Sequence, residues 1–279
     1  MTEELNKLIT NALQEDIREG DHTSLACIPK SAIGKAKLLV KENGVIAGVE
    51  VAKFIFLKVD PSIKVTVFIK DGDSIKVGDI ILEVEGPSIS ILTAERLVLN
   101  CMQRMSAIAT KTRKIKTLIK GTKAQVLDTR KTTPNFRHLE KLAVKIGGGT
   151  NHRFGLYDMM MIKDNHIDFA GGISAAIQKA NLYQEEKEIN IHIEIEARSI
   201  EEVVEILSQG NIHRIMLDNF SIEDTIKAVE LIGNKYQTES SGGITEETIA
   251  EYAKCGVDFI SVGALTHSIQ SLDLSLKAI

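Results

Sequence analysis

Apolar residues recur at helical spacing in two parts of the chain, over residues 3–17 and again from about 93 to 120. Between them, in residues 34–91, short β-branched runs are separated by turn pairs such as Asn43-Gly44 and Asp71-Gly72. Such pairs between apolar runs are typical of β-hairpins. The pattern therefore predicts a helix, a β layer and a long second helix.

The β layer allows two interpretations. Its run GDSIKVGDIILEVEG has the rhythm of a hammerhead or lipoyl-type β module. A carrier domain of that type needs a modifiable lysine at a hairpin tip, and no tip in this segment offers a convincing one. We interpret the segment as a structural β layer, with a swinging-arm carrier as the alternative.

From Ala124 onward, short apolar runs alternate with amphipathic segments. Strands are predicted at 124–128, 159–163, 189–196, 213–218, 235–239 and 258–262. Helices are predicted at about 136–146, 171–184, 199–209, 221–232 and 245–255. Repeated βα units imply a parallel sheet, either a barrel or an open, doubly wound sheet. Because six units fall short of the eight of a complete barrel, we predict an α/β protein with an open or incomplete α/β barrel.

Composition limits the function classes. Hydrophobic residues make up 43% of the 279 residues, enough for a full-sized core, and the net charge of −4 argues against general nucleic-acid binding. The three cysteines form no CxxC pair, so we expect a reducing compartment. The acidic, amphipathic N-terminal segment is not a signal peptide, and no apolar run is long enough to cross a bilayer. We therefore expect a cytoplasmic protein without nucleic-acid or membrane partners.

One segment departs from the overall acidity. Residues 128–166 contain seven Lys and Arg against four Asp and Glu, or +3. Arg130-Lys131 and Lys163 follow predicted strands, and His152-Arg153 follow a triple glycine, Gly147–Gly149. Cations at strand ends and beside glycine turns indicate a pocket for an anion with several charges.

The predicted strand 189–196 alternates isoleucine with polar residues. Side chains on a strand alternate between its faces, so one face would be apolar and the other would carry His192, Glu194 and Glu196. A surface edge strand explains this pattern as well. Within a series of βα units a central strand is favoured, and Glu196 would then reach the mouth of the barrel.

The next predicted strand ends at Asp218, on the same rim. Two carboxylates, Glu196 and Asp218, beside a basic pocket suit Mg²⁺, which usually takes one or two carboxylates plus substrate oxygens. The alternative is that Asp218 caps the helix that begins near Ser221.

The last two βα turns place glycine between a strand and a helix, in Ser241-Gly242-Gly243 and Val262-Gly263-Ala264. Backbone N–H groups at such turns, with a helix N-terminus behind them, bind phosphate. Simple tight turns are the alternative.

Arg104 lies beside the apolar stripe of the long helix, and its spacing alone predicts a solvated arginine.

These residues lie in runs that together resemble the quinolinate phosphoribosyltransferase family, whose members are also called nicotinate-nucleotide pyrophosphorylases (carboxylating). The runs stand in family order and span nearly the whole chain. They are EDIREGDHTS, LTAERLVLNCMQRMSAIAT, LDTRKTTPNFRHLEKLAVKIGGGTNHRFGLYDMMMIKDNH, IEIEARS, IMLDNF, ESSGGI and SVGALTHS. One departure is Asn135-Phe136, where the family usually has glycine and leucine.

The resemblance implies an N-terminal α/β sandwich over residues 1–110, with the tail from about 268 to 279 packed against it, and a barrel domain over 111–267. It implies transfer of phosphoribosyl from 5-phosphoribosyl-1-pyrophosphate to quinolinate, with release of pyrophosphate and CO₂ and formation of nicotinate mononucleotide for NAD biosynthesis. Mg²⁺ is the implied cofactor. The implied assembly is a homodimer, or a hexamer of such dimers.

The resemblance also implies roles for individual residues. Lys131, Lys163, Glu196 and Asp218 would be catalytic, with the two acids near the ribose hydroxyls and Mg²⁺. The glycine turns would take the phosphate of the phosphoribosyl group. Quinolinate would be held by Thr129, Arg130, Lys131, His152, Arg153 and Lys163, and by Arg104 from the neighbouring subunit.

Three other readings stay open at this point. A phosphate-binding barrel aldolase or synthase would use Lys163 as a Schiff-base lysine. A molybdate-utilisation paralogue would share the fold, although the intact IKDNH run argues against it. An assembly or carrier protein built on the β module would leave the set of cations and carboxylates unexplained.

Overall fold

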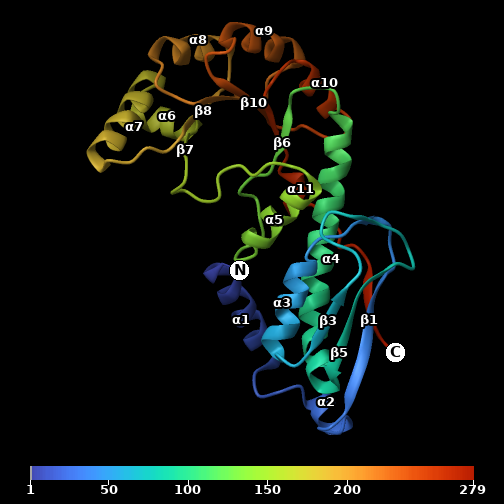
Figure 1. Cartoon of the computed structure of the whole chain (residues 1–279). Coiled ribbons are helices and arrows are strands. Elements are labelled where there is room, and N and C mark those ends of the chain that lie inside the picture. The colour runs from blue at the N-terminus through green and yellow to red at the C-terminus, as the bar shows by residue number, and fades with distance from the viewer. Residues whose placement is uncertain (1) are drawn as a thin grey trace. The chain divides into compact units, whose positions relative to one another are not determined.

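The computed structural model describes residues 2–279, which form two compact units (Figure 1). The first comprises the chain up to Arg113 together with Thr132–Gly148 and Ala264–Ile279. The second comprises Lys114–Lys131 and Gly149–Gly263. The sequence placed residues 111–267 in one domain and did not anticipate that 132–148 groups with the N-terminal unit.

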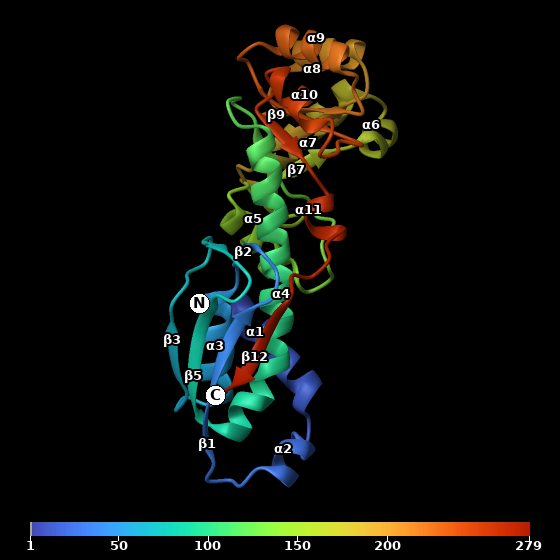
Figure 2. The ribbon, with the colours of Figure 1, turned by 90° about the vertical axis from the view of Figure 1, so that its right-hand side faces the viewer.

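The first unit is built on an antiparallel sheet whose order is β12-β1-β5-β3 (Figure 2). Its strands are β1 (Ile33–Val40), β3 (Lys64–Val67), β5 (Ile80–Pro87) and β12 (Leu274–Ala278). The short strands β2 (Gly44–Val45) and β4 (Ser74–Ile75) pair separately. Since β12 pairs with β1, the C-terminal tail is part of this unit.

Helices complete the first unit. They are α1 (Glu3–Ile17), α2 (His22–Cys27), α3 (Val49–Val59), most of α4 (Ser88–Leu118), α5 (Arg137–Gly147) and α11 (Ala264–His267). The last residues of α4, from Lys114, belong to the second unit. Of these, α3 interrupts the segment that the sequence suggested as hairpins, and it contacts β3. The side chains of Cys101, Met105 and Ile108 on α4 are fully buried, as its apolar stripe predicted.

The second unit contains the predicted parallel sheet. All six of its strands are parallel, in the order β6-β11-β10-β9-β8-β7. The strands are β6 (Gln125–Leu127), β7 (Met160–Ile162), β8 (Ile193–Ala197), β9 (Arg214–Asp218), β10 (Gln237–Ser241) and β11 (Phe259–Ser261). The strands β6 and β7 form the two edges, so the sheet is open as predicted.

Helices connect these strands. They are α6 (Asp164–Ala170), α7 (Ile173–Lys187), α8 (Ile200–Gln209), α9 (Ile222–Ile232) and α10 (Ile249–Lys254). Figure 1 shows α8 and α9 on the outer side of the sheet. The sequence did not predict α6, and α10 begins later than the predicted start at 245.

Strand β8 is central, between β7 and β9, so the alternative of a surface edge strand is wrong. The strand begins at Ile193, and the predicted residues 189–192 lie before it. His192 consequently does not share the polar face of the strand. It is exposed and stacks on His213, with ring centroids 4.3 Å apart.

Strand register decides which side chains meet. Glu196 pairs in register with Met216, and Met216 with Glu239, so these positions share one face of the sheet. Lys163, Glu194, Arg214, Asp218 and Ser241 belong to the same face by alternation. On β8 and β9 the opposite face is apolar, and Ile193, Ile195 and Ile215 on it are fully buried. The sheet therefore directs its charged side chains to one side.

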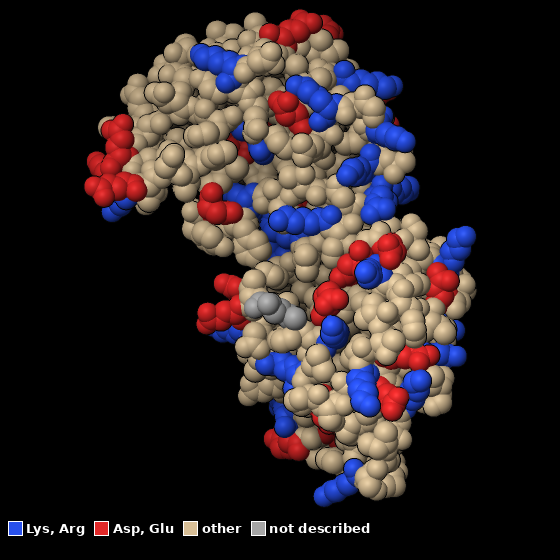
Figure 3. All heavy atoms as spheres, in the orientation of Figure 1, with Lys and Arg blue, Asp and Glu red and all other residues tan. Residues whose placement is uncertain are grey.

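Two further observations concern the surface. None of the described helices has both the length and the apolar character of a membrane span. On the face drawn in Figure 3, Lys and Arg are interspersed with Asp and Glu rather than gathered into one basic field.

Candidate functional site

Polar side chains gather where the parallel strands of the second unit end. Lys163 directly follows β7, and its backbone N–H donates to Nδ1 of His166 across the first turn of α6 (3.0 Å). Its ammonium group contacts the carboxylate of Glu196 near the end of β8. The Lys163 side chain is 43% exposed and that of Glu196 only 10%. The buried carboxylate of Glu196 therefore holds the Lys163 ammonium group in place, with its positive charge facing solvent.

Asp218 is the last residue of β9 and is half-buried. Its Oδ2 accepts a hydrogen bond from the Asn219 side chain (2.9 Å). The cap of α9 is Ser221, whose side chain accepts from Asp224 N–H (3.1 Å). The interpretation of Asp218 as the helix cap is therefore wrong, and its carboxylate is available for other chemistry on this rim.

Basic residues occupy two neighbouring loops of the same unit. Arg130 and Lys131 follow β6, where Oγ1 of Thr129 accepts from Lys131 N–H (3.0 Å). The second loop carries Arg153 and is tied to the first because His152 N–H donates to Oδ1 of buried Asp128 (2.8 Å). These bonds bring residues 128–131 and 151–153 together.

The electrostatics of Arg153 show how close the charges lie. Burial lowers the pKa of the Arg153 guanidinium, and the nearby charge of Arg130 lowers it further. Glu194, Asp158 and Glu196 act in the opposite direction. Two guanidinium groups that repel one another in a partly buried loop favour an anionic ligand between them.

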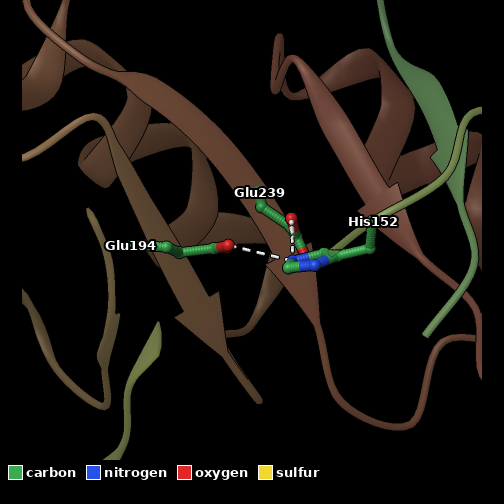
Figure 4. Close-up of side chains that lie close together, drawn as sticks. All are labelled: His152, Glu194 and Glu239. Atoms are coloured by element: carbon green, nitrogen blue, oxygen red, sulfur yellow. Dashed lines mark ion pairs between the residues drawn. The ribbon is translucent and has the colours of Figure 1, made fainter. Parts of the chain in front are cut away.

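Beneath this loop lies a buried cluster that the sequence did not identify (Figure 4). Nε2 of His152 is 2.9 Å from Oε2 of Glu194 and 3.5 Å from Oε2 of Glu239. Arg214 Nη1 is 2.8 Å from the same oxygen of Glu239. Both carboxylates are fully buried. From the sequence, Glu194 was expected on the polar face of its strand but was given no role. The only sequence feature that could have pointed to Glu239 is a carboxylate within a predicted core strand.

The cluster changes the acidity of its members. Burial lowers the pKa of His152, but hydrogen bonds to Glu194 and Glu239 outweigh it and raise the value to about 9. Burial, with the charge of Glu239, raises the pKa of Glu194 to about 7. Burial also acts to raise the pKa of Glu239, yet His152 and Arg214 hold it below its ordinary value. The backbone N–H of Arg153 donates to Nδ1 of His152, so a second ring proton, on Nδ1, would break this hydrogen bond.

The glycine turns lie at the ends of β10 and β11. Gly242 has a φ of +92°, and a Cβ there would lie 2.8 Å from the backbone nitrogen of Asn219, so the turn requires glycine. No helix begins directly behind the first turn, because α10 starts at Ile249, so the expected helix N-terminus there is wrong. Behind the second turn the four-residue helix α11 begins at Ala264, and both loops lie on the same rim.

The remaining predicted residues divide between the units. Val262 and Gly263 close the second unit, and Ala264 begins α11 in the first. Of the seven cations in residues 128–166, those on α5 also belong to the first unit. These are Arg137, Lys141 and Lys145.

Arg104 lies on α4 in the first unit and is not a freely solvated side chain. Its Nε and Nη2 donate to Oε1 of Glu140 (3.1 and 2.8 Å), and Nη2 also donates to the carbonyl of Thr266 (2.7 Å). Glu140 is fully buried and also accepts from Oγ1 of Thr133 (2.9 Å). The guanidinium is therefore held in one orientation, and the reading by spacing alone is wrong.

Comparison with known proteins places this chain in a family. The model described as "Quinolinate phosphoribosyl transferase, C-terminal domain" matches residues 108–277, and the N-terminal domain of the same family matches residues 21–106. A chloroplastic nicotinate-nucleotide pyrophosphorylase [carboxylating] of Arabidopsis thaliana is 45% identical over 99% of this chain and 83% of its own length. A probable enzyme of the same name from Bacillus subtilis (strain 168) is 41% identical over 98% and 93%.

Solved structures agree. The nicotinate-nucleotide pyrophosphorylase of Francisella tularensis superposes with a TM-score of 0.92 at 39% identity, over 99% of this chain and 96% of that one. NadC of Streptococcus pyogenes gives 0.92 at 38%, over 99% and 97%. Both matches extend over the two units. The chain therefore belongs to the quinolinate phosphoribosyl transferase family, whose members are enzymes.

Proposed function

We propose that this protein transfers phosphoribosyl from 5-phosphoribosyl-1-pyrophosphate to quinolinate and removes one carboxylate, giving nicotinate mononucleotide, pyrophosphate and CO₂ in NAD biosynthesis. Relatives that are 41–45% identical carry names for this reaction. The observation that supports it best is the pair of basic loops with Arg130 and Arg153, close enough to Glu196 for the charges to interact. A dianionic substrate and a polyanionic one both require such a pocket.

Quinolinate is the proposed ligand of the basic loops. A planar guanidinium binds a carboxylate through two parallel hydrogen bonds, and a dicarboxylate offers two such groups. Arg130 and Arg153 would supply the forks, with Lys131 and Thr129 beside them in the loop after β6. His152 is 7% exposed, so it would meet the ligand only with a ring edge.

The phosphoribosyl group would bind along the rim formed by β8, β9 and β10. Glu196 and Asp218 share one sheet face at the ends of neighbouring strands and would meet the ribose hydroxyls. The turns Ser241–Gly243 and Val262–Ala264 would take the phosphate with backbone N–H groups. These roles use polar groups that the strand register already directs to one side.

Mg²⁺ is the proposed cofactor, and the donor set suits it. Glu196 and Asp218 offer carboxylate oxygens, which Mg²⁺ prefers, and the ion would complete its shell from substrate oxygens and water. When bound it would neutralise charge on the pyrophosphate. Since one oxygen of Glu196 contacts Lys163, that carboxylate would reach the ion through its other oxygen or through water.

The chain's own residues would act mainly through charge and position. Pyrophosphate leaves C1 of the ribose, and Lys163 stabilises the negative charge that develops on it, while Glu196 and Asp218 stabilise the positive charge on the sugar ring. Charge that is preorganised where new charge develops is usually the largest catalytic contribution. Arg130 and Arg153 hold the pyridine in line for attack by its nitrogen. When CO₂ then leaves, the electron pair of the broken bond stays on C2, where the adjacent cationic nitrogen stabilises it, and C2 takes up a proton from water.

We further propose a homodimer, or a hexamer of such dimers, in which Arg104 completes the site of the neighbouring subunit. Its guanidinium is already held by Glu140, so it would enter that site in a fixed orientation. We propose a cytoplasmic location as well. The three cysteines are free, which fits a reducing compartment.

A turnover assay tests the proposal. Purified protein is mixed with quinolinate, 5-phosphoribosyl-1-pyrophosphate and Mg²⁺, and both CO₂ and nicotinate mononucleotide are followed, with nicotinate as the control acceptor. We expect product from quinolinate and none from nicotinate. A folded sample that forms no product from quinolinate contradicts the proposal and favours a paralogue with a changed substrate, while borohydride trapping of Lys163 with a carbonyl substrate favours an aldolase.

A further inference from the structure

Three side chains from distant parts of the chain meet in the interior of the second unit, beneath the basic loops. His152 comes from the loop before β7, Glu194 from β8 and Glu239 from β10 (Figure 4). Glu194 and Glu239 are fully buried, and His152 is 7% exposed. Two buried carboxylates that converge on one imidazole are costly unless they are compensated, so the arrangement calls for an explanation.

The imidazole distinguishes two explanations. A metal ion could be held by the three residues, since their ligand atoms all lie within 4.8 Å of one another. Such an ion requires Nε2 without a proton. However, Nδ1 accepts the backbone N–H of Arg153 (2.7 Å), so a ring proton is carried by Nε2, which lies 2.9 Å from Oε2 of Glu194. Arg214 already provides a cation for Glu239. The geometry thus favours a network of buried ion pairs among these side chains.

The same ring is linked to the substrate-facing loop. Its Nδ1 accepts a hydrogen bond from the backbone N–H of Arg153, and the backbone N–H of His152 donates to Oδ1 of Asp128 (2.8 Å). The Arg153 guanidinium then donates through Nη1 to the carbonyl of Met159 (3.2 Å). A rotation of the imidazole would therefore shift the base of the Arg153 side chain.

We propose that Glu194 and Glu239, the latter held by Arg214, are positioning residues that fix the ring of His152 and, through it, the guanidinium of Arg153 that binds a substrate carboxylate. The inference rests on the proposed function for the identity of that carboxylate. The network also places negative charge under the two repelling guanidinium groups of Arg130 and Arg153. The two guanidinium groups can then stay in place in the empty pocket. Ligand binding therefore does not have to include the cost of ordering them.

Substitution with glutamine tests the network, because Glu194→Gln and Glu239→Gln preserve size and remove charge. We expect each to weaken quinolinate binding, measured by calorimetry, by about tenfold or more, the scale of a hydrogen bond to a charged group. The KM for 5-phosphoribosyl-1-pyrophosphate should change less. Glu230→Gln, at an exposed position on α9, is the matched control. Wild-type affinity in both cluster variants would overturn the proposal.

A double-variant cycle separates positioning from a general structural effect. If Glu194 acts through His152, then Glu194→Gln should cost little additional affinity in a His152→Ala background. An equal loss in both backgrounds overturns the proposal. Circular dichroism of each variant verifies that it is folded.

The wild-type protein supplies a test that needs neither variants nor turnover. Nitrogen-15 NMR of the labelled histidine rings identifies which ring nitrogen carries the proton, and a His152→Gln sample assigns the signal. We expect Nε2 of His152 to be protonated at neutral pH. A ring protonated on Nδ1 alone overturns the network, whatever the substrate. Inactivity toward quinolinate with Nε2 protonated would instead count against the proposed function.

Discussion

At the residue scale, the chemistry of the proposed site depends most on Lys163. Its ammonium group is paired with Glu196 yet remains 43% exposed, so it can face an anionic leaving group. We expect Lys163→Ala to lower turnover by about two orders of magnitude or more, the scale of losing one oxyanion donor. Steady-state kinetics with quinolinate measure this loss. Lys254→Ala, at an exposed position on α10, is the control, and near wild-type turnover of Lys163→Ala contradicts the assigned role.

The cysteines give a second prediction at this scale. Burial raises the pKa of the Cys101 thiol to about 12, and burial also raises that of Cys255. Since the thiolate is the nucleophile, both should resist alkylation in the folded protein. We expect iodoacetamide at mildly alkaline pH to modify exposed Cys27 first, as measured by peptide mass spectrometry. A urea-unfolded sample is the control, and equal labelling of Cys101 and Cys27 in the folded protein contradicts the prediction.

At the scale of elements, the turn after β10 is constrained by its geometry. Gly242 and Gly243 both have positive φ, at +92° and +60°. Alanine at either position costs about 1–2 kcal/mol of backbone strain. At Gly242 the added Cβ also meets the backbone of Asn219, whereas at Gly243 it meets open space.

We therefore expect Gly242→Ala to lower the Tm more than Gly243→Ala. The reason is that overpacking at Gly242 lowers the free energy of unfolding by about a further 1–3 kcal/mol. Gly242→Ala should also weaken binding of 5-phosphoribosyl-1-pyrophosphate. Thermal unfolding followed by circular dichroism compares the two variants. If their Tm values are equal, the close approach to Asn219 does not constrain the turn.

At the scale of the whole molecule, the proposed shared site predicts complementation between subunits. Arg104→Ala and Lys163→Ala should each be nearly inactive as homodimers. In a mixed dimer, the subunit that keeps Lys163 receives Arg104 from its partner, and one site of the two is complete. We expect unfolding and refolding of an equal mixture to restore roughly a quarter of wild-type activity, because half of the dimers are mixed. Activity that stays at the level of the separate variants would show that Arg104 acts within its own chain.

The sequence by itself determined most of the local structures, although α3 and α6 were not predicted. The first helix spans 3–17 as predicted, and all six strands of the parallel sheet lie within about two to four residues of their predicted bounds. Helical and strand periodicity are local properties, since they depend on which residues of one segment face the core. The position of Lys163, Glu196 and Asp218 at strand ends follows from the same local patterns.

The tertiary structure alone decided which segments meet. Nothing local in the chain says that residues 152, 194 and 239 converge, or that Arg214 joins them, because these contacts depend on strand order and register. Nor does it say that Thr132–Gly148 groups with the first unit, where Glu140 orients Arg104. The physical reason is that the pairing of distant strands and the burial of charges are set by packing across the whole chain. Local periodicity fixes only the face that each segment presents.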